Sequence, residues 1–168
     1  MRKIIMSLSL LLILTSCAAI PDKGAFFDYQ NGALRAEGIW HENGNEYGVI
    51  LTAGPLKNGQ RESMRIEFTS PETVSGTVYL IENGQLTATL GDMTLELNIG
   101  ARERIFRLAN MFSLKSPDIT EIKVDNDKNT VAEGKGWTVR TDGDGSPVLI
   151  DTGTSSFEIS EFETAGAE

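Results

Sequence analysis

The sequence predicts a mainly β domain in which a curved antiparallel sheet, or half-open β-barrel, wraps around a single amphipathic helix. Most of residues 33–162 alternate apolar and polar side chains with the two-residue period of half-buried strands. Asn-Gly and Gly-Asp pairs separate several of these runs, as in hairpins. One segment, 102–112, has a helical period instead. A sheet of about ten strands accumulates twist and curls, so the helix is expected on its concave face.

The N-terminal segment has the features of an export signal. Arg2 and Lys3 precede an apolar run, 4–14, that is shorter than the roughly twenty residues a membrane-spanning helix needs. Residues 14–17 read Leu-Thr-Ser-Cys and resemble the lipobox of bacterial lipoproteins. That resemblance implies cleavage before Cys17 and a diacylglyceryl thioether, with palmitate-type acyl chains, on its sulfur. We therefore expect residues 1–16 to be a lipoprotein signal peptide; the alternative is an ordinary signal peptide followed by an incidental cysteine.

The composition indicates how the chain could attach to a membrane. Cys17 is the only cysteine, so no disulfide can stabilise the fold, and two or more acyl chains on it would anchor the protein stably. The net charge is −9 and falls by two more when Arg2 and Lys3 are removed. This acidity argues against nucleic acid and against electrostatic adhesion to anionic lipid. We expect attachment through the lipid alone, on the extracytoplasmic side of the cell membrane or the outer membrane.

The elements follow in order after a lipidated tether and lead-in, 17–32, whose aromatic residues Phe26, Phe27 and Tyr29 are expected to dock on the domain edge. The alternation then predicts an antiparallel meander of six strands with one apolar face. These strands are expected at 34–40, 47–53, 64–69, 73–82, 86–90 and 93–97.

The second half opens with the helix, in which Ile105, Leu108, Ala109 and Phe112 stand at i, i+3, i+4 and i+7. Pro117 prevents the chain from resuming a helix. Five further strands are expected, at 119–124, 130–133, 137–141, 147–151 and 156–162. The domain is thus expected to span 33–162, with a flexible tail at 163–168.

The sequence gives little support for a catalytic site or a metal site. His41 is the only histidine and is expected in an exposed turn, and no Gly-x-Ser-x-Gly motif is present. The acidic loops beginning at Asp125 and Asp142 lack the glycine and glutamate positions of a calcium-binding EF-hand. Asp, Asn and Gly are also favoured in turns for backbone reasons, so we interpret both loops as turns. We expect no catalytic residue, no metal and no cofactor beyond the lipid on Cys17.

The remaining candidate site is the concave apolar face. Methionine and phenylalanine side chains along a curved sheet suit an acyl chain if space remains between them. The alternative is that the same residues form a filled core. The candidate lining residues are Trp40, Tyr47, Leu51, Met64, Phe68, Leu86, Leu95, Phe106 and Phe112.

A family resemblance rests on two stretches of the chain. Residues 64–71, Met-Arg-Ile-Glu-Phe-Thr-Ser-Pro, are similar to the "R-x-E-F-x-x-P" strand of the LolA/LolB-like lipoprotein-carrier superfamily. Residues 137–150, a strand, an Asp-Gly-Asp-Gly turn and a second strand, fit its second half. The resemblance implies a half-open barrel that holds acyl chains in an apolar hollow. Family members usually have more helices than the one expected here, which leaves the hollow open, shallow or filled.

Two functions are compatible with these features. The first is an anchored lipoprotein that binds or relays a lipid or acyl ligand. The second is a tethered module that binds another envelope protein and has a filled core without a ligand cavity.

The anchor gives the first testable prediction. Cys17→Ser removes the sulfur that would carry the lipid, so the variant should leave the membrane fraction and lose the mass of the lipid adduct. Membrane fractionation and intact-mass spectrometry measure both effects. Unchanged partitioning and mass would contradict lipidation.

Overall fold

The structure, a computed structural model, describes residues 22–165 and contains one open sheet of eleven antiparallel strands. The expected signal peptide, 1–16, and Cys17 lie outside the described residues. Within 22–165 no helix is long and apolar enough to cross a membrane. In spatial order the strands are β8 (Met93–Thr94), β7 (Gln85–Leu90), β6 (Thr77–Glu82), β5 (Ser63–Ser70), β2 (Asn45–Ala53), β1 (Ala33–Glu42), β13 (Ser155–Ala165), β12 (Pro147–Asp151), β11 (Trp137–Thr141), β10 (Thr130–Gly134) and β9 (Ile119–Val124).

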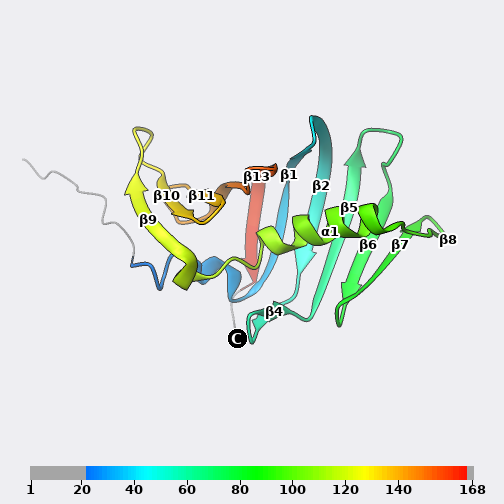
Figure 1. The fold of residues 1–168 in the computed structure, drawn as a ribbon, viewed down its shortest axis with the longest axis horizontal. Coiled ribbons are helices and arrows are strands. Elements are labelled where there is room, and N and C mark those ends of the chain that lie inside the picture. The colour runs from blue at the N-terminus through cyan, green and yellow to red at the C-terminus, as the bar shows by residue number, and fades with distance from the viewer. Residues whose placement is uncertain (1–21, 166–168) are drawn as a thin grey trace, which may run out of the picture.

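The first and last strands meet at the centre of the sheet. β1 pairs with β2 on one side and with β13 on the other, from Ala33 opposite Ala165 to Glu42 opposite Ser155, with one register shift between Glu37 and Gly38 of β1. Each half beyond this pair is a meander of successive hairpins, as the alternation predicts. The sheet curves and does not close (Figure 1), which confirms the expected fold class.

The single long helix, α1 (Ile99–Met111), lies across the strands of the first half (Figure 1). Asn98 caps its N-terminus, because its Oδ1 accepts a hydrogen bond from the Ala101 N–H at 2.8 Å. The expected apolar stripe is confirmed: Ile105, Leu108 and Ala109 are buried, and Phe112, just after the helix, is fully buried. The stripe therefore faces the sheet.

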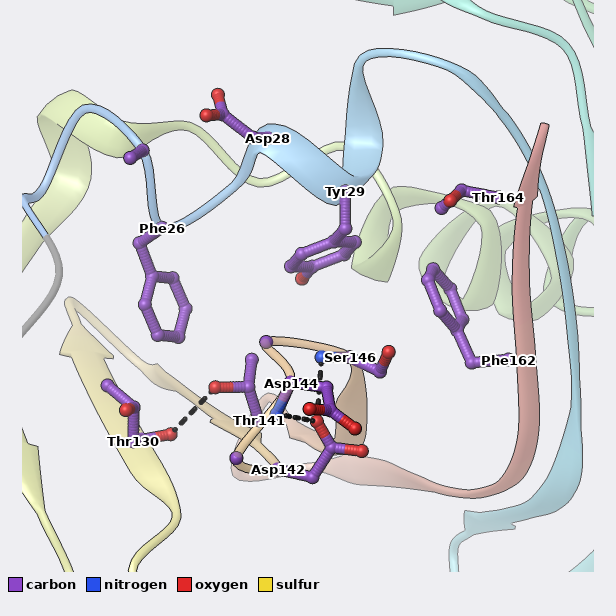
Figure 2. A pocket seen from close by; sticks show the side chains of 13 residues that line it. Phe26, Asp28, Tyr29, Thr130, Thr141, Asp142, Asp144, Ser146, Phe162 and Thr164 are labelled. Carbon is purple, nitrogen blue, oxygen red and sulfur yellow. Dashed lines mark hydrogen bonds between the residues drawn. The ribbon is translucent and has the colours of Figure 1, made fainter. Parts of the chain in front are cut away.

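A gap opens in the sheet beside β13, where the neighbouring strand β12 is much shorter. β13 is eleven residues long, but β12 pairs only with Ser156–Glu158. The C-terminal half of β13 continues along β1 without β12 beside it. The lead-in, which contains the 3-10 helix η1 (Asp28–Gln30), lies across this gap between β13 and the 142–146 turn (Figure 2). We call the gap the notch.

The lead-in belongs to the folded body. Phe26 and Phe27 are each only 5% exposed, so the docking expected from their aromatic character is confirmed. The Phe27 ring contacts Trp137 of β11, and the Tyr29 ring contacts Phe162 of β13 edge-on at 5.6 Å. These contacts join the two sides of the notch.

Several boundaries differ from the sequence expectation. β6 begins at Thr77 and not at residue 73, because Pro71 and Gly76, whose φ is +80°, form a turn before it. The strand expected at 93–97 is paired only at Met93–Thr94. A small hairpin, β3 (Leu56–Lys57) with β4 (Gln60–Arg61), was not expected. The tail expected from residue 163 is wrong for Glu163–Ala165, which pair with β1.

Gly38 provides a test of the central pairing. It lies where the register of β1 and β13 shifts, and a Cβ there would collide with the backbone carbonyl of Glu158. Gly38→Ala should lower the free energy of unfolding by about 1–3 kcal/mol, because the backbone must separate. Urea unfolding of the full chain measures this. Gly143→Ala, where a Cβ meets open space, is the matched control; equal stability of the two variants would contradict the tight approach.

Candidate functional site

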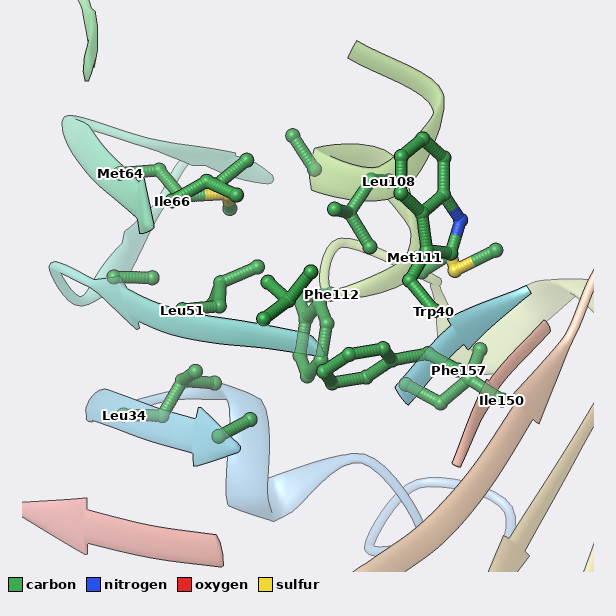
Figure 3. Close-up of a cluster of buried hydrophobic side chains, with 14 of the residues drawn as sticks. Leu34, Trp40, Leu51, Met64, Ile66, Leu108, Met111, Phe112, Ile150 and Phe157 are labelled. Carbon is green, nitrogen blue, oxygen red and sulfur yellow. The ribbon is translucent and has the colours of Figure 1, made fainter. Parts of the chain in front are cut away.

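The nine candidate lining residues lie mostly in the hydrophobic core. Six of them are at most 6% exposed: Trp40, Leu51, Met64, Phe68, Leu86 and Phe112. Tyr47, Leu95 and Phe106 are half-buried. The structure therefore places most of the expected ligand face in a packed interior. Figure 3 shows helix residues Leu108 and Met111, with Phe112, gathered against Trp40, Leu51 and Phe157 of the sheet.

Aromatic rings continue the packing across the strands. Trp40, Tyr47 and Phe68 contact one another with ring centroids 5.4–6.0 Å apart, and Phe68 also contacts Tyr79. Phe112 meets Phe157 at 5.6 Å. Edge-on contacts at these distances are typical of a close-packed core. Two of the nine candidates, Met64 and Phe106, also line a small space of about 200 Å³ beside α1.

One guanidinium holds the end of α1 in place. Arg61 of β4 donates to four backbone carbonyls: from Nη1 to Gly54 at 2.6 Å and Gly32 at 3.2 Å, from Nη2 to Gln30 at 3.0 Å, and from Nε to Phe112 at 3.1 Å. These acceptors belong to the lead-in, the segment after β2 and the end of the helix. Burial lowers the pKa of Arg61 to about 10, so the side chain stays charged at neutral pH.

An ion pair between the buried Glu42 and the exposed Arg107 holds the middle of the helix. Glu42, at the end of β1, is 3% exposed and accepts from the Arg107 Nη2 of α1 at 3.0 Å. Replacing Arg107 would leave the buried Glu42 carboxylate without its cationic partner, which is destabilising. Arg61 and Glu42 thus fix α1 at two points. The concave face is occupied by a helix held by polar contacts as well as by apolar packing.

A larger pocket, about 610 Å³, occupies the notch (Figure 2). Phe26 and Tyr29 of the lead-in form one wall, Phe162 of β13 forms a second, and the turn after β11 forms the floor. The remaining lining residues are Ala25, Asp28, Thr130, Thr141, Asp142, Gly143, Asp144, Gly145, Ser146 and Thr164. A volume of this size lies within the range of small-ligand sites.

Hydrogen bonds within the turn hold the floor of the notch pocket together. Asp142 Oδ1 accepts hydrogen bonds from the N–H groups of Asp144 at 3.0 Å and Ser146 at 2.9 Å. The Thr141 hydroxyl donates to the Thr130 carbonyl at 3.4 Å. Burial raises the pKa of Tyr29, so its hydroxyl stays protonated at neutral pH.

The second acidic loop closes in the same way. Asp125 Oδ1 accepts from the N–H groups of Asp127 and Asn129, each at 2.9 Å. Desolvation acts to raise the pKa of Asp125, but these hydrogen bonds outweigh it and hold the pKa below its usual range. In both loops the first carboxylate closes the turn, as the turn interpretation predicts.

The expected position of His41 is wrong. It lies within β1 on the polar face of the sheet and not in a turn. Its Nδ1 is 3.6 Å from Glu46 and its Nε2 is 3.5 Å from Glu158. Its neighbours are therefore carboxylates on the two adjacent strands.

Sequence reasoning missed the notch pocket because its walls come from three distant segments, 25–29, 130–146 and 162–164. The one signal available was the cluster of aromatic residues in the lead-in, which indicates docking. It does not indicate where the docked segment leaves a space.

The fold defined by these contacts is an open antiparallel sheet whose concave face is filled by one helix. The same fold occurs in MucB, whose crystal structure aligns with a TM-score of 0.55 at 9% identity, over 91% of this chain and 61% of that one. This chain thus spans about three fifths of the length of MucB.

Two further solved structures align less closely. A LolA superfamily protein from Nitrosomonas europaea gives a TM-score of 0.46 at 11% identity, over 86% of this chain and 94% of that one. An uncharacterized conserved protein from Thermus thermophilus gives 0.48 at 12% identity, over 88% and 86%. No family model and no curated protein matches the sequence.

The role of Arg61 can be tested directly. Arg61→Met leaves four carbonyls without their donor, and we expect a loss of about 3 kcal/mol in the free energy of unfolding, with faster amide exchange at the end of α1. Arg61→Lys should recover part of this loss, since the ammonium still offers three donors. Arg65→Met, which breaks only the half-exposed pair with Glu67, should cost less than about 1 kcal/mol. An Arg61→Met variant as stable as the Arg65→Met control would refute this role.

Proposed function

We propose that this chain is an extracytoplasmic module, held at a membrane by lipid on Cys17, that binds a protein of the cell envelope through its outer surface. The observation that carries the proposal is the filled concave face. Leu51, Leu108, Phe112 and Phe157 have no exposed surface, although they lie where an acyl ligand would have to enter.

The small space left beside α1 favours a protein partner over an acyl ligand held on the concave face. Pockets for small ligands usually enclose about 300–1,000 Å³ and are mostly apolar. The space beside α1 encloses about 200 Å³ and is partly lined by polar residues such as Arg61 and Asn110. A close-packed interior admits an acyl chain only if side chains move, and Arg61 and Arg107 hold α1 against that movement.

The lead-in supports the membrane side of the proposal. It packs on the domain from residue 22 onward, and Lys23 Nζ donates to the carbonyl of Ile119 at 3.0 Å at the β9 edge of the sheet. A lipid on Cys17 would therefore be only a few residues from the folded body. The domain would work near the membrane surface.

Acyl-ligand binding is the second candidate, and the space beside α1 is the observation that favours it. Met64, Ile81, Phe106 and Ala109 give it an apolar side next to the helix. A bound chain would have to enlarge this space.

A relative by fold offers a comparison for the partner. MucB has been crystallised in complex with MucA. A protein partner for the present chain is a proposal of the same kind, and it rests on the packing described above and not on that likeness.

Native mass spectrometry of the full chain separates the two candidates. The proposal expects a mass equal to the chain plus its covalent anchor. Photo-crosslinking in the cell, with a photoreactive residue at Thr164 or Met93, should give a discrete adduct with one protein. A stoichiometric non-covalent acyl ligand, released only on denaturation and accompanied by no protein adduct, would overturn the proposal in favour of the second candidate.

A further inference from the structure

The notch pocket has a chemistry that the packed interior lacks. Three aromatic rings, Phe26, Tyr29 and Phe162, converge on it from two segments (Figure 2). Phe26 is 5% exposed, and Tyr29 and Phe162 are half-buried, so the rings are held in place by the fold. Aromatic faces carry negative partial charge and attract cations lying over them.

The charges of the lining all have one sign. Its thirteen residues include three carboxylates and no lysine, arginine or histidine. Asp28 points away from the turn in Figure 2, whereas Asp142 and Asp144 form part of the floor. Asp142 Oδ1 is used to close the turn. Among residues 22–165, its Oδ2 and both oxygens of Asp144 receive no hydrogen bond and remain available to a ligand.

The geometry points to a recognition site for a basic side chain, and we propose that the notch pocket binds an arginine of an extended segment in the protein partner. This inference rests on the proposed function and names the chemistry of the partner. The cavity and its rings define the site, and the carboxylates determine the sign of the charge it accepts.

Arginine fits these walls better than lysine. A guanidinium is planar, stacks on aromatic faces and presents paired N–H donors to carboxylates. An ammonium is a compact and strongly hydrated charge that stacks poorly. The hydroxyls of Ser146 and Thr164 lie on the same lining and can accept further N–H groups. The only charged side chains of the lining are carboxylates, so its charge disfavours an anionic ligand.

The test uses the full chain in detergent and a short blocked peptide, acetyl-Gly-Arg-Gly-amide. Binding is followed by the NMR shifts of ¹⁵N-labelled phenylalanine and tyrosine amides. We expect saturable shifts at Phe26, Tyr29 and Phe162, and at least tenfold weaker binding of the peptide in which neutral citrulline replaces arginine. The lysine peptide should bind at an intermediate level.

Two variants and one matched control locate the site. Asp144→Asn and Phe162→Leu should each weaken binding of the arginine peptide by about five- to tenfold. Asp127→Asn removes a carboxylate at the equivalent position of the second acidic loop, which does not line the pocket, and should leave binding unchanged. Equal binding of arginine and citrulline peptides, or an equal loss in Asp127→Asn, would overturn the inference. Tighter binding of phosphoethanolamine than of the arginine peptide would overturn it too, in favour of a lipid headgroup.

The same variants distinguish this inference from the proposed function. If the adduct formed in the cell survives in Asp144→Asn and Phe162→Leu at wild-type yield, the partner binds elsewhere, and the arginine site is refuted while the interaction module stands. If peptide binding depends on both residues and the adduct is lost with them, the inference is supported.

Discussion

The arrangement of the whole molecule depends on the Arg61 guanidinium. This one side chain donates hydrogen bonds to carbonyls of the lead-in, of the segment after β2 and of the end of α1. No carboxylate takes part in these four bonds, so the charge is balanced by backbone dipoles. A half-buried cation bound in this way tolerates little displacement, because every lost bond leaves a carbonyl without a donor. The position of the helix and the docking of the lead-in are therefore fixed by the same group.

Because these Arg61 hydrogen bonds hold α1 in place, the concave face of the sheet is not the open surface of the fold. In an open sheet the concave face is the obvious hollow, yet here α1 fills it, and the fully buried row of Ala132, Val139, Ile150 and Phe157 continues the packing into the second half. A cavity of about 610 Å³ arises instead where β12 separates from β13. The binding surface is thus a product of unequal strand lengths, and the lead-in provides its outer wall.

The sequence predicted the elements better than the site. Alternation located the strands at 119–124, 137–141 and 147–151 with their observed limits, because each is bounded by turn residues. It misplaced the start of β6, where β-branched residues continue through a turn made by Pro71 and Gly76. The apolar positions of the concave face were found, but periodicity cannot distinguish a lined cavity from a filled one. The roles of Arg61 and the notch depend on contacts between distant segments, which local patterns do not encode.

The pairing of β1 with β13 also determines when the domain can finish folding. Ten residue pairs at the centre of the sheet join the first strand to the last. A chain that is synthesised N-terminus first cannot make these pairs until the residues of β13 have emerged. Until then β1 has one free edge, the notch has no Phe162 wall, and the two meanders are not connected through the sheet. Completion of the fold therefore waits for β13, and a truncation of this strand alone would divide the domain at its middle and not at its end.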